Sequence, residues 1–362
     1  MSTAPPYPSE RPADRTGRAA RSAGAPPGSA DRGPAGRLAT WAYVLRTTNL
    51  PEGGELDPVS KWLVATRASV LPMTFFAAGI GGVLAAAAHP VDLWLLAVCT
   101  LGLMLAHVSN NLMNDWFDTR GGVDTPGYAR TQYAPHPLLS GIVTEREMLR
   151  AILLVNALDL CIALYLGWVR GPLVLAFALA GFAISYFYVA PPLRLKHHGL
   201  GEPSVLVIWG PLMTAGSYFI ASGELPAWVW LASLPYGLLV MAVLFGKHID
   251  KLEADSAKGI HTLPVLLGAT QARRATQALI AGFFATSVLF VAAGILTPWV
   301  LLSFLAVARV RKVWRVFDEP APSEPPRNYP LWPLWYVAAA FVMIRQVGTL
   351  FVLGLLISAL LT

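Results

Sequence analysis

Two carboxylates close a long hydrophobic segment of this chain. Asp115 and Asp118 follow an apolar run over residues 93–112, and His107 and Asn111 lie inside that run. On a helix His107, Asn111 and Asp115 occupy positions i, i+4 and i+8, and the second aspartate follows one turn later. These side chains therefore form one polar stripe on an otherwise apolar helix. Because charges beside a membrane span are costly unless paired, the stripe is a candidate site for a divalent cation.

A second acidic segment follows another apolar run, over residues 228–246. It contains Asp250, Glu253 and Asp255, interleaved with lysines, and a solvated loop is the alternative interpretation. Two groups of carboxylates that face each other repel unless cations lie between them. Magnesium prefers oxygen ligands and takes one or two carboxylates together with substrate phosphates, so it suits a site for a diphosphate leaving group. The predicted catalytic acids and Mg2+ ligands are Asp115, Asp118, Asp250 and Asp255.

Polar and aromatic side chains near the acids complete the predicted site. Basic residues would bind the remaining phosphate oxygens. Tyr186 and Tyr188 end a further apolar run and can offer a hydroxyl to phosphate or a ring face to an allylic cation, and the latter tyrosine is assigned a catalytic role. An aromatic belt at the membrane interface is the other interpretation of both tyrosines. The further predicted substrate-binding residues are Asn111, Asn114, Arg130, Arg194, Lys196, Lys247 and Glu253.

The elements that position these residues are membrane helices. The chain has 362 residues, of which 55% are hydrophobic and only 13% are charged, and its mean hydropathy is +0.53. Soluble proteins carry about 25% charged residues, so the composition predicts an all-α, polytopic membrane bundle. Nine apolar runs approach or reach the length that a bilayer requires, although three of them are short. They cover 68–88, 93–112, 151–168, 174–189, 205–221, 228–246, 275–296, 299–308 and 334–361.

The distribution of Lys and Arg predicts the orientation of the bundle. With the amino terminus inside, nearly all basic loop residues fall on the inner side, and Arg170 alone falls in an outer loop. The positive-inside rule then favours a multi-pass protein of the cell membrane with a cytoplasmic amino terminus and an odd number of spans. Both acidic segments would lie on the cytoplasmic side.

The first forty residues differ in composition from the rest. Residues 1–40 are rich in Pro, Ala, Gly, Ser and Arg and have few large apolar side chains. Such a segment cannot bury enough surface to fold, so we predict a disordered cytoplasmic tail at 1–40 and a transmembrane domain at 41–362.

Four segments resemble the UbiA superfamily of intramembrane prenyltransferases. They are NDWFDTRGGVDT (114–125), HPLLSG (136–141), YVAPPLRLKHHGLGE (188–202) and GIHTLPVLLG (259–268). The first segment, with its further acid Asp124, is most similar to the 1,4-dihydroxy-2-naphthoate prenyltransferases of menaquinone synthesis, and the resemblance implies a substrate-binding role for Asp124. The resemblance implies a bundle of about nine helices with a central cytoplasm-facing cavity and two magnesium ions. It also implies a polyprenyl diphosphate donor, an aromatic acceptor, the lipid bilayer as surroundings and no nucleic-acid partner.

The second acidic segment departs from the family pattern of two aspartates four residues apart. Asp255 matches the second aspartate, but Lys251 stands where the first belongs, and Asp250 comes one residue early. Either the helix breaks and lets Asp250 and Asp255 converge, which we favour, or it stays regular and Asp250 pairs with Glu253.

Two other functions are open at this point. A relative with a different acceptor, such as a phenol, a lipid or a specialised metabolite, is compatible with the altered second segment. An ion-coupled transporter would use acids deep in the spans and broken helices. Here the acids lie at span ends beside basic residues, which favours phosphate chemistry.

Overall fold

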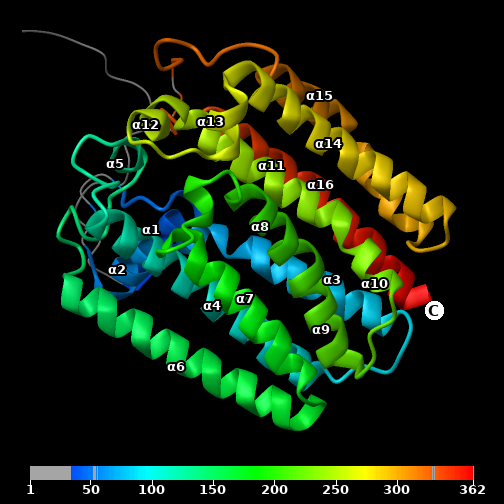
Figure 1. Cartoon of the computed structure of the whole chain (residues 1–362). Coiled ribbons are helices and arrows are strands. Elements are labelled where there is room, and N and C mark those ends of the chain that lie inside the picture. Colours follow the sequence, from blue (N-terminus) through cyan, green and yellow to red (C-terminus); the bar gives the residue numbers. More distant parts are fainter. Residues whose placement is uncertain (1–33, 52–53, 55, 328, 330, 362) are drawn as a thin grey trace, which may run out of the picture.

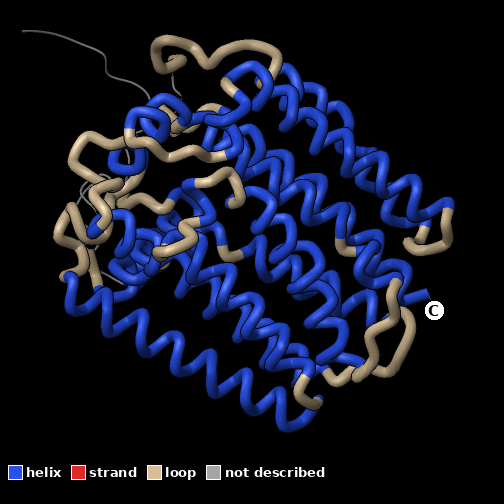
Figure 2. Tube along the Cα trace, in the orientation of Figure 1, coloured by secondary structure: helices blue, strands red, loops and turns tan. Residues whose placement is uncertain are grey.

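The computed structural model describes residues 34–51, 54, 56–327, 329 and 331–361, and within them the chain is helical (Figures 1 and 2). Extended backbone pairs at one isolated bridge among these residues, between His198 and His261. The predicted all-α membrane bundle is therefore confirmed. The longest helices are α3 (Pro72–Ala86), α4 (Leu93–Arg120), α6 (Glu145–Arg170), α7 (Leu173–Val189), α11 (Leu234–Asp250), α14 (Ala269–Ala292) and α16 (Tyr336–Leu361).

Seven segments of the described chain form helices long and apolar enough to cross a membrane, so the predicted count of about nine is not confirmed. The run at 174–189 forms the shorter apolar helix α7, of 17 residues. The run at 299–308 forms a 3-10 helix, η4 (Pro298–Ala306), which continues into α15 (Val307–Val316). Helix α15 carries Arg309, Arg311, Lys312 and Arg315, and these charges explain why the segment does not qualify as a span.

Local caps fix where the spans next to the site begin. The side chain of Asp92 accepts a hydrogen bond from the amide of Leu95 and starts α4. Thr144 and Glu147 form a reciprocal capping box that starts α6. Helix α4 has 28 residues and is about 42 Å long, whereas the hydrocarbon core of a bilayer is about 30 Å thick. Its last turns therefore extend beyond the apolar stretch.

One span is assembled from three pieces, α8 (Gly201–Val207), η3 (Ile208–Leu212) and α9 (Met213–Ser222). The middle piece is a π-helical turn that contains Pro211. Proline has no amide hydrogen to donate, and its ring clashes with the carbonyl one helical turn earlier. The regular pattern of helical hydrogen bonds is therefore interrupted there. Another span combines the short helix α10 (Trp228–Ala232) with α11.

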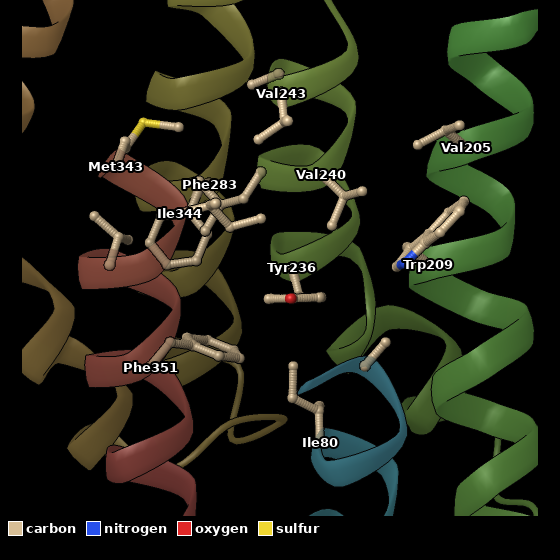
Figure 3. Close-up of a cluster of buried hydrophobic side chains, with 14 of the residues drawn as sticks. Ile80, Val205, Trp209, Tyr236, Val240, Val243, Phe283, Met343, Ile344 and Phe351 are labelled. Atoms are coloured by element: carbon tan, nitrogen blue, oxygen red, sulfur yellow. The ribbon is translucent and has the colours of Figure 1, made fainter. Parts of the chain in front are cut away.

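The hydrophobic core lies where α3, α11, α14 and α16 meet α8 and α9. Figure 3 shows its side chains: Ile80 from α3 and Tyr236 from α11 face Phe283 and Phe351 from α14 and α16. Close helix contact depends on small residues, because a Cβ at Gly81 would lie 2.1 Å from Ser217 Oγ and 2.3 Å from Thr214 O on α9. Helix α6 lies at one edge of the bundle and α15 at the opposite edge (Figure 1).

Short helices and loops gather at one end of the bundle, which we call the polar end (Figure 1). They include α1 (Pro34–Thr47), α2 (Pro58–Ala65), η1 (Ala68–Val70), α5 (Ala129–Tyr133), η2 (Leu195–His197), α12 (Leu252–Ala257) and α13 (Leu263–Leu267). Residues 1–33 of the predicted tail lie outside the described residues. Residues 34–40, the last part of the predicted tail, belong to α1.

Candidate active site

A cavity of about 420 Å3 extends from the polar end into the bundle. Its inner wall is largely apolar and includes Leu103, Phe177 and Val240, while Asn114 and Lys247 line its polar part. A pocket of this size is typical of small-molecule sites, and its mixture of walls suits a ligand with one charged end and one apolar end.

The last turns of α4 supply the first group of acids. Asn111, Asn114, Asp115 and Asp118 are all buried, as expected for a polar stripe that faces the bundle. Asn111 Nδ2 donates to the carbonyl of Thr66 at 3.0 Å, which ties the stripe to the segment before α3. The helical spacing predicted from sequence therefore gathers these four side chains on the inner face of one helix.

Asp115 has no exposed surface and is enclosed by cationic and polar groups. Arg67 Nη2 donates to its Oδ1, Arg130 Nη2 lies 3.7 Å from Oδ2, and His136 Nε2 lies 3.7 Å from Oδ1. A carboxylate this deeply buried is stable only with such partners. Arg67 and His136 were not among the predicted site residues, although the family-like segment HPLLSG, which begins at His136, was a signal for the second of them.

Asp124 lies next to this group and interacts with His136. Its Oδ2 is 2.9 Å from His136 Nε2, and ligand atoms of Asp115, Asp124 and His136 all lie within 4.8 Å of one another. Burial raises the pKa of Asp124, but the hydrogen bond and charge of His136, together with the charges of Lys196 and Lys251, lower it more, so that this pKa lies below its ordinary value. These three residues are a set that can hold a metal ion.

Asp118 and Asn114 share the ammonium group of Lys196. Lys196 Nζ donates to Asp118 Oδ2 at 2.6 Å and to Asn114 Oδ1 at 3.5 Å, and all three side chains are buried. The structure therefore brings Lys196 into the site. Arg194, in contrast, is exposed and does not reach the site. It stands just before η2 with a left-handed backbone conformation, φ 41°.

Asp250 was predicted as a metal ligand, and the structure places its carboxylate against backbone amides. Helix α11 ends at Asp250 and α12 begins at Leu252, so the helix breaks as we favoured. The carboxylate then turns to the start of α16, where it accepts hydrogen bonds from the amides of Trp335, Tyr336 and Val337 at 2.8–3.1 Å. Its oxygens cap the free N–H groups of a helix, so Asp250 and Asp255 do not converge.

Asp255 is the acid of the second segment that reaches the site. Tyr128 donates its hydroxyl hydrogen to Asp255 Oδ1, and Lys251 Nζ lies 3.2 Å from the same oxygen. Burial raises the pKa of Asp255, but the charges of Lys251 and His248 and the bond from Tyr128 outweigh it, and the pKa lies below its ordinary value.

Glu253, the alternative partner, is exposed at the surface and has no hydrogen bond or ion pair recorded among the described residues. The regular-helix alternative, in which it pairs with Asp250, therefore does not occur.

The two tyrosines of α7 differ in their surroundings. Tyr188 is buried and lines the cavity. Tyr186 packs against Phe117 and Phe182, with ring centroids 5.8 and 6.0 Å away, and does not line the cavity described above. Tyr186 therefore packs among aromatic side chains, and Tyr188 is the tyrosine placed to contact a ligand.

Several buried polar atoms at the site have no hydrogen-bond partner within the described part of the chain. Among the acids they are Oδ2 of Asp115 and Oδ2 of Asp255, and among the bases they are Nε of Arg67 with Nε and Nη2 of Arg130. Because an unsatisfied buried polar atom is costly, the cluster is suited to a ligand that carries both a cation and an anion.

The fold and site define a multi-pass membrane protein whose charged cluster stands at the head of an apolar cavity. A sequence model of the UbiA prenyltransferase family matches residues 72–337. The chain therefore belongs to this family and is a prenyltransferase, as its sequence motifs predicted.

Curated relatives and solved structures agree with this assignment. The chain is 30% identical over 277 residues to a 1,4-dihydroxy-2-naphthoate octaprenyltransferase of Escherichia coli, covering 73% of this chain and 88% of the relative. It is 25% identical over 248 residues to the Bacillus subtilis protein of the same name, covering 67% and 78%.

Among solved structures, a UbiA homolog from Archaeoglobus fulgidus bound to GPP and Mg2+ has a TM-score of 0.53 at 17% identity, covering 81% of this chain and 99% of that chain. A digeranylgeranylglyceryl phosphate synthase has a TM-score of 0.51 at 16% identity, covering 84% and 99%. These two structures establish the fold.

Proposed function

We propose that this protein transfers a polyprenyl group from a polyprenyl diphosphate to an aromatic acceptor, with 1,4-dihydroxy-2-naphthoate as the best candidate, in menaquinone synthesis. The names of the curated relatives support the naphthoate. A structural relative that was solved with GPP and Mg2+ supports a prenyl diphosphate and a divalent cation.

This proposal rests on one observation. The same buried cluster contains acidic oxygens and basic N–H groups that lack hydrogen-bond partners among the described residues. Among the described residues, carboxylate oxygens of Asp115 and Asp255 without a hydrogen-bond donor favour a cation, and guanidinium N–H groups of Arg67 and Arg130 without an acceptor favour an anion. Arg130 Nη2 and Asp115 Oδ2 face each other at 3.7 Å, too far apart for a hydrogen bond. A metal diphosphate supplies both charges in one ligand. The apolar wall of the adjoining cavity then accommodates the prenyl tail.

The residues present fit a divalent cation on the α4 side of the site. Asp115 and Asp124 supply hard oxygen donors, and His136, whose ring nitrogen lies within 4.8 Å of both, orients Asp124 through a 2.9 Å contact. Asp118, one turn after Asp115 on α4, is proposed as a further oxygen donor. When bound, Mg2+ neutralises the diphosphate and makes it a better leaving group. Arg67, Arg130, Lys196 and Lys247 remain to bind the phosphate oxygens.

Prenyl transfer then breaks the bond between the first prenyl carbon and the diphosphate oxygen. The bonding electron pair leaves with the diphosphate, and the apolar cavity shields the allylic cation from water. Tyr188 lines the cavity, where an aromatic ring can stabilise positive charge. An electron-rich ring carbon of the acceptor forms the new bond and loses a proton, or its carboxylate as carbon dioxide.

We also infer that the polar end faces the cytoplasm and that the bundle lies in the cell membrane. The basic residues of α15 and of the segments that hold Arg130, Lys196 and Lys258 support this orientation through the positive-inside rule. The amino-terminal segment, predicted as a tail at 1–40, would then be cytoplasmic as well.

The test is a transfer assay with purified protein, Mg2+, a radiolabelled polyprenyl diphosphate and a panel of naphthoate, phenol and glycerol phosphate acceptors. We expect label in the naphthoate product, and loss of product in excess chelator. Asp115→Asn and Asp118→Asn should lower turnover by roughly two orders of magnitude or more. Glu253→Gln, which removes an exposed acid from the same end of the bundle, should leave turnover near normal.

Two results would contradict the proposal. Near-normal turnover of both aspartate variants, or of the wild type in chelator, would show that the reaction does not require a metal ion. Label in a phenol or glycerol phosphate and none in the naphthoate would reassign the acceptor while keeping the reaction class.

A further inference from the structure

The second acidic segment provides one carboxylate to the site, although two were expected from its sequence. Asp250 caps α16 through three backbone amides, and Glu253 is exposed. Asp255 therefore stands alone as the carboxylate of this segment at the site. A protein-bound magnesium ion uses one or two carboxylates together with phosphate, so this side of the site is at the lower limit of what the ion requires.

That single carboxylate already has a cation of its own. Lys251 Nζ lies 3.2 Å from Asp255 Oδ1, and both residues are buried. The same ammonium lies 4.9 Å from the ring centroid of Tyr128, whose hydroxyl donates to Asp255 Oδ1. Lys251 is thus held by an ion pair and a cation–π contact, and both partners raise its pKa above the ordinary value despite the opposing effect of burial.

The position of Lys251 also brings it near the first group of acids. Its ammonium lies 4.9 Å from the ring centroid of Tyr128, and Tyr128 follows Asp124 by four residues in the loop after α4. A second divalent ion at Asp255 would have to lie next to this ammonium and be repelled by it. An ammonium group has three donors, so Lys251 can contact Asp255 and still donate to a phosphate oxygen.

We propose that the Lys251 ammonium takes the place of a second divalent cation, so that this protein binds its diphosphate substrate with one metal ion. That ion lies with Asp115, Asp118 and Asp124, and Lys251 neutralises the opposite side of the diphosphate beside Asp255. The inference rests on the proposed function, because it requires a diphosphate ligand.

The test measures metal stoichiometry on the full-length protein in detergent. Mn2+ replaces Mg2+, and geranyl S-thiolodiphosphate, which resists ionisation, replaces the donor. Equilibrium dialysis then gives the number of Mn2+ ions bound per bound analogue. We expect one for the wild type and two for Lys251→Asp, because the new carboxylate removes the ammonium and adds a ligand one helical turn before Asp255.

Two further variants separate charge from folding. Lys251→Gln should keep a ratio of one and bind the analogue roughly tenfold more weakly, since a charge-assisted hydrogen bond is lost. Lys258→Gln is the matched control, because Lys258 is exposed, lies 5.6 Å from the same Tyr128 ring and bonds to Gly122 O and Thr125. It should match the wild type in both ratio and affinity.

A wild-type ratio of two or more would overturn the inference while leaving the proposed function intact. A ratio of one Mn2+ per analogue in a folded Lys251→Asp variant would also overturn the inference. If that variant does not fold, the wild-type ratio alone decides. If the wild type binds neither Mn2+ nor the analogue, the proposed function fails, and the inference fails with it.

Discussion

Asp115 shows how this chain keeps a carboxylate fully buried at the end of a membrane helix. Its neighbours Arg67, Arg130 and His136 come from three separate segments and surround it with positive or donating groups. A buried ion pair contributes little net stability, but loss of one partner leaves a charge uncompensated and is costly. The enclosure therefore serves the site, and each enclosing residue is a sensitive position.

His136→Gln should weaken metal binding, because the variant loses the imidazole that orients Asp124. Loss of such a supporting hydrogen bond typically costs 10–100-fold in metal affinity, so we expect the Mg2+ concentration for half-maximal transfer to rise by roughly that factor. The measurement is turnover as a function of Mg2+ concentration. His89→Gln is the control, since His89 lies away from the site. Its Nε2 is 3.9 Å from Glu224 Oε2. An unchanged Mg2+ requirement in folded His136→Gln would show that Asp124 is not a ligand.

At the scale of helices, the break after α11 determines which acids reach the site. Asp250 ends α11 and binds the first amides of α16, whereas Asp255 lies on α12 and turns toward Tyr128. An acid that joins two spans is thus followed, five positions later, by an acid that faces the ligand site. The break at Lys251 is what allows these different directions.

Asp250→Ala should destabilise the bundle and leave metal binding intact. It removes a helix cap that is worth about 0.5–2 kcal/mol, so the midpoint of thermal unfolding in detergent should fall by several degrees. Mn2+ and analogue affinity of the folded fraction should match the wild type. A large loss of metal affinity with unchanged thermal stability would restore Asp250 to the metal site.

A second prediction about helices concerns the close contact between α3 and α9 and its contribution to the stability of the bundle. Gly81→Ala puts a methyl group against the backbone carbonyl of Thr214, and overpacking of this kind costs roughly 1–3 kcal/mol. Gly79→Ala is the matched control two residues earlier, where a Cβ meets nothing within 4 Å. We expect a lower unfolding midpoint for Gly81→Ala and an equal or higher one for Gly79→Ala. Equal midpoints would show that α3 and α9 can separate without cost.

At the scale of the whole molecule, helix α1 contributes to the cavity, although its first residues fall within the predicted tail. Arg46, Thr47 and Thr48, at and just after the end of α1, line the cavity, and Trp41 donates to the carboxylate of Asp57, 3.1 Å away. Helix α1 is therefore part of the ligand chamber, although its sequence has a weak apolar pattern.

Two truncations test this contribution of α1. Deletion of residues 2–33 should leave turnover within a few-fold, because a segment with so few large apolar residues contributes no packed core. Deletion of residues 2–48 should abolish transfer, because it removes part of the cavity wall. Turnover per folded protein in detergent is the measurement. Full activity of the longer deletion would exclude α1 from the active chamber.

The sequence determined this protein's class through features that are local along the chain. Apolar runs of sufficient length make membrane helices wherever they occur, and the i, i+3 spacing of Asp115 and Asp118 puts both on one face of α4. Motif similarity identified the family that the comparisons confirmed. The number of spans was less accessible, because short or charged segments such as η4 and α15 depend on neighbouring helices for their place.

Only the tertiary structure decided which charged groups meet. Asp250 was predicted as a metal ligand, yet its carboxylate binds amides of α16 that lie 85 to 87 residues away in sequence. Arg67 lies 48 residues from Asp115, and Tyr128 lies 127 residues from Asp255. No local spacing encodes such pairs, because they arise when folded helices bring distant loops to one end of the bundle and buried charges take the partners within reach.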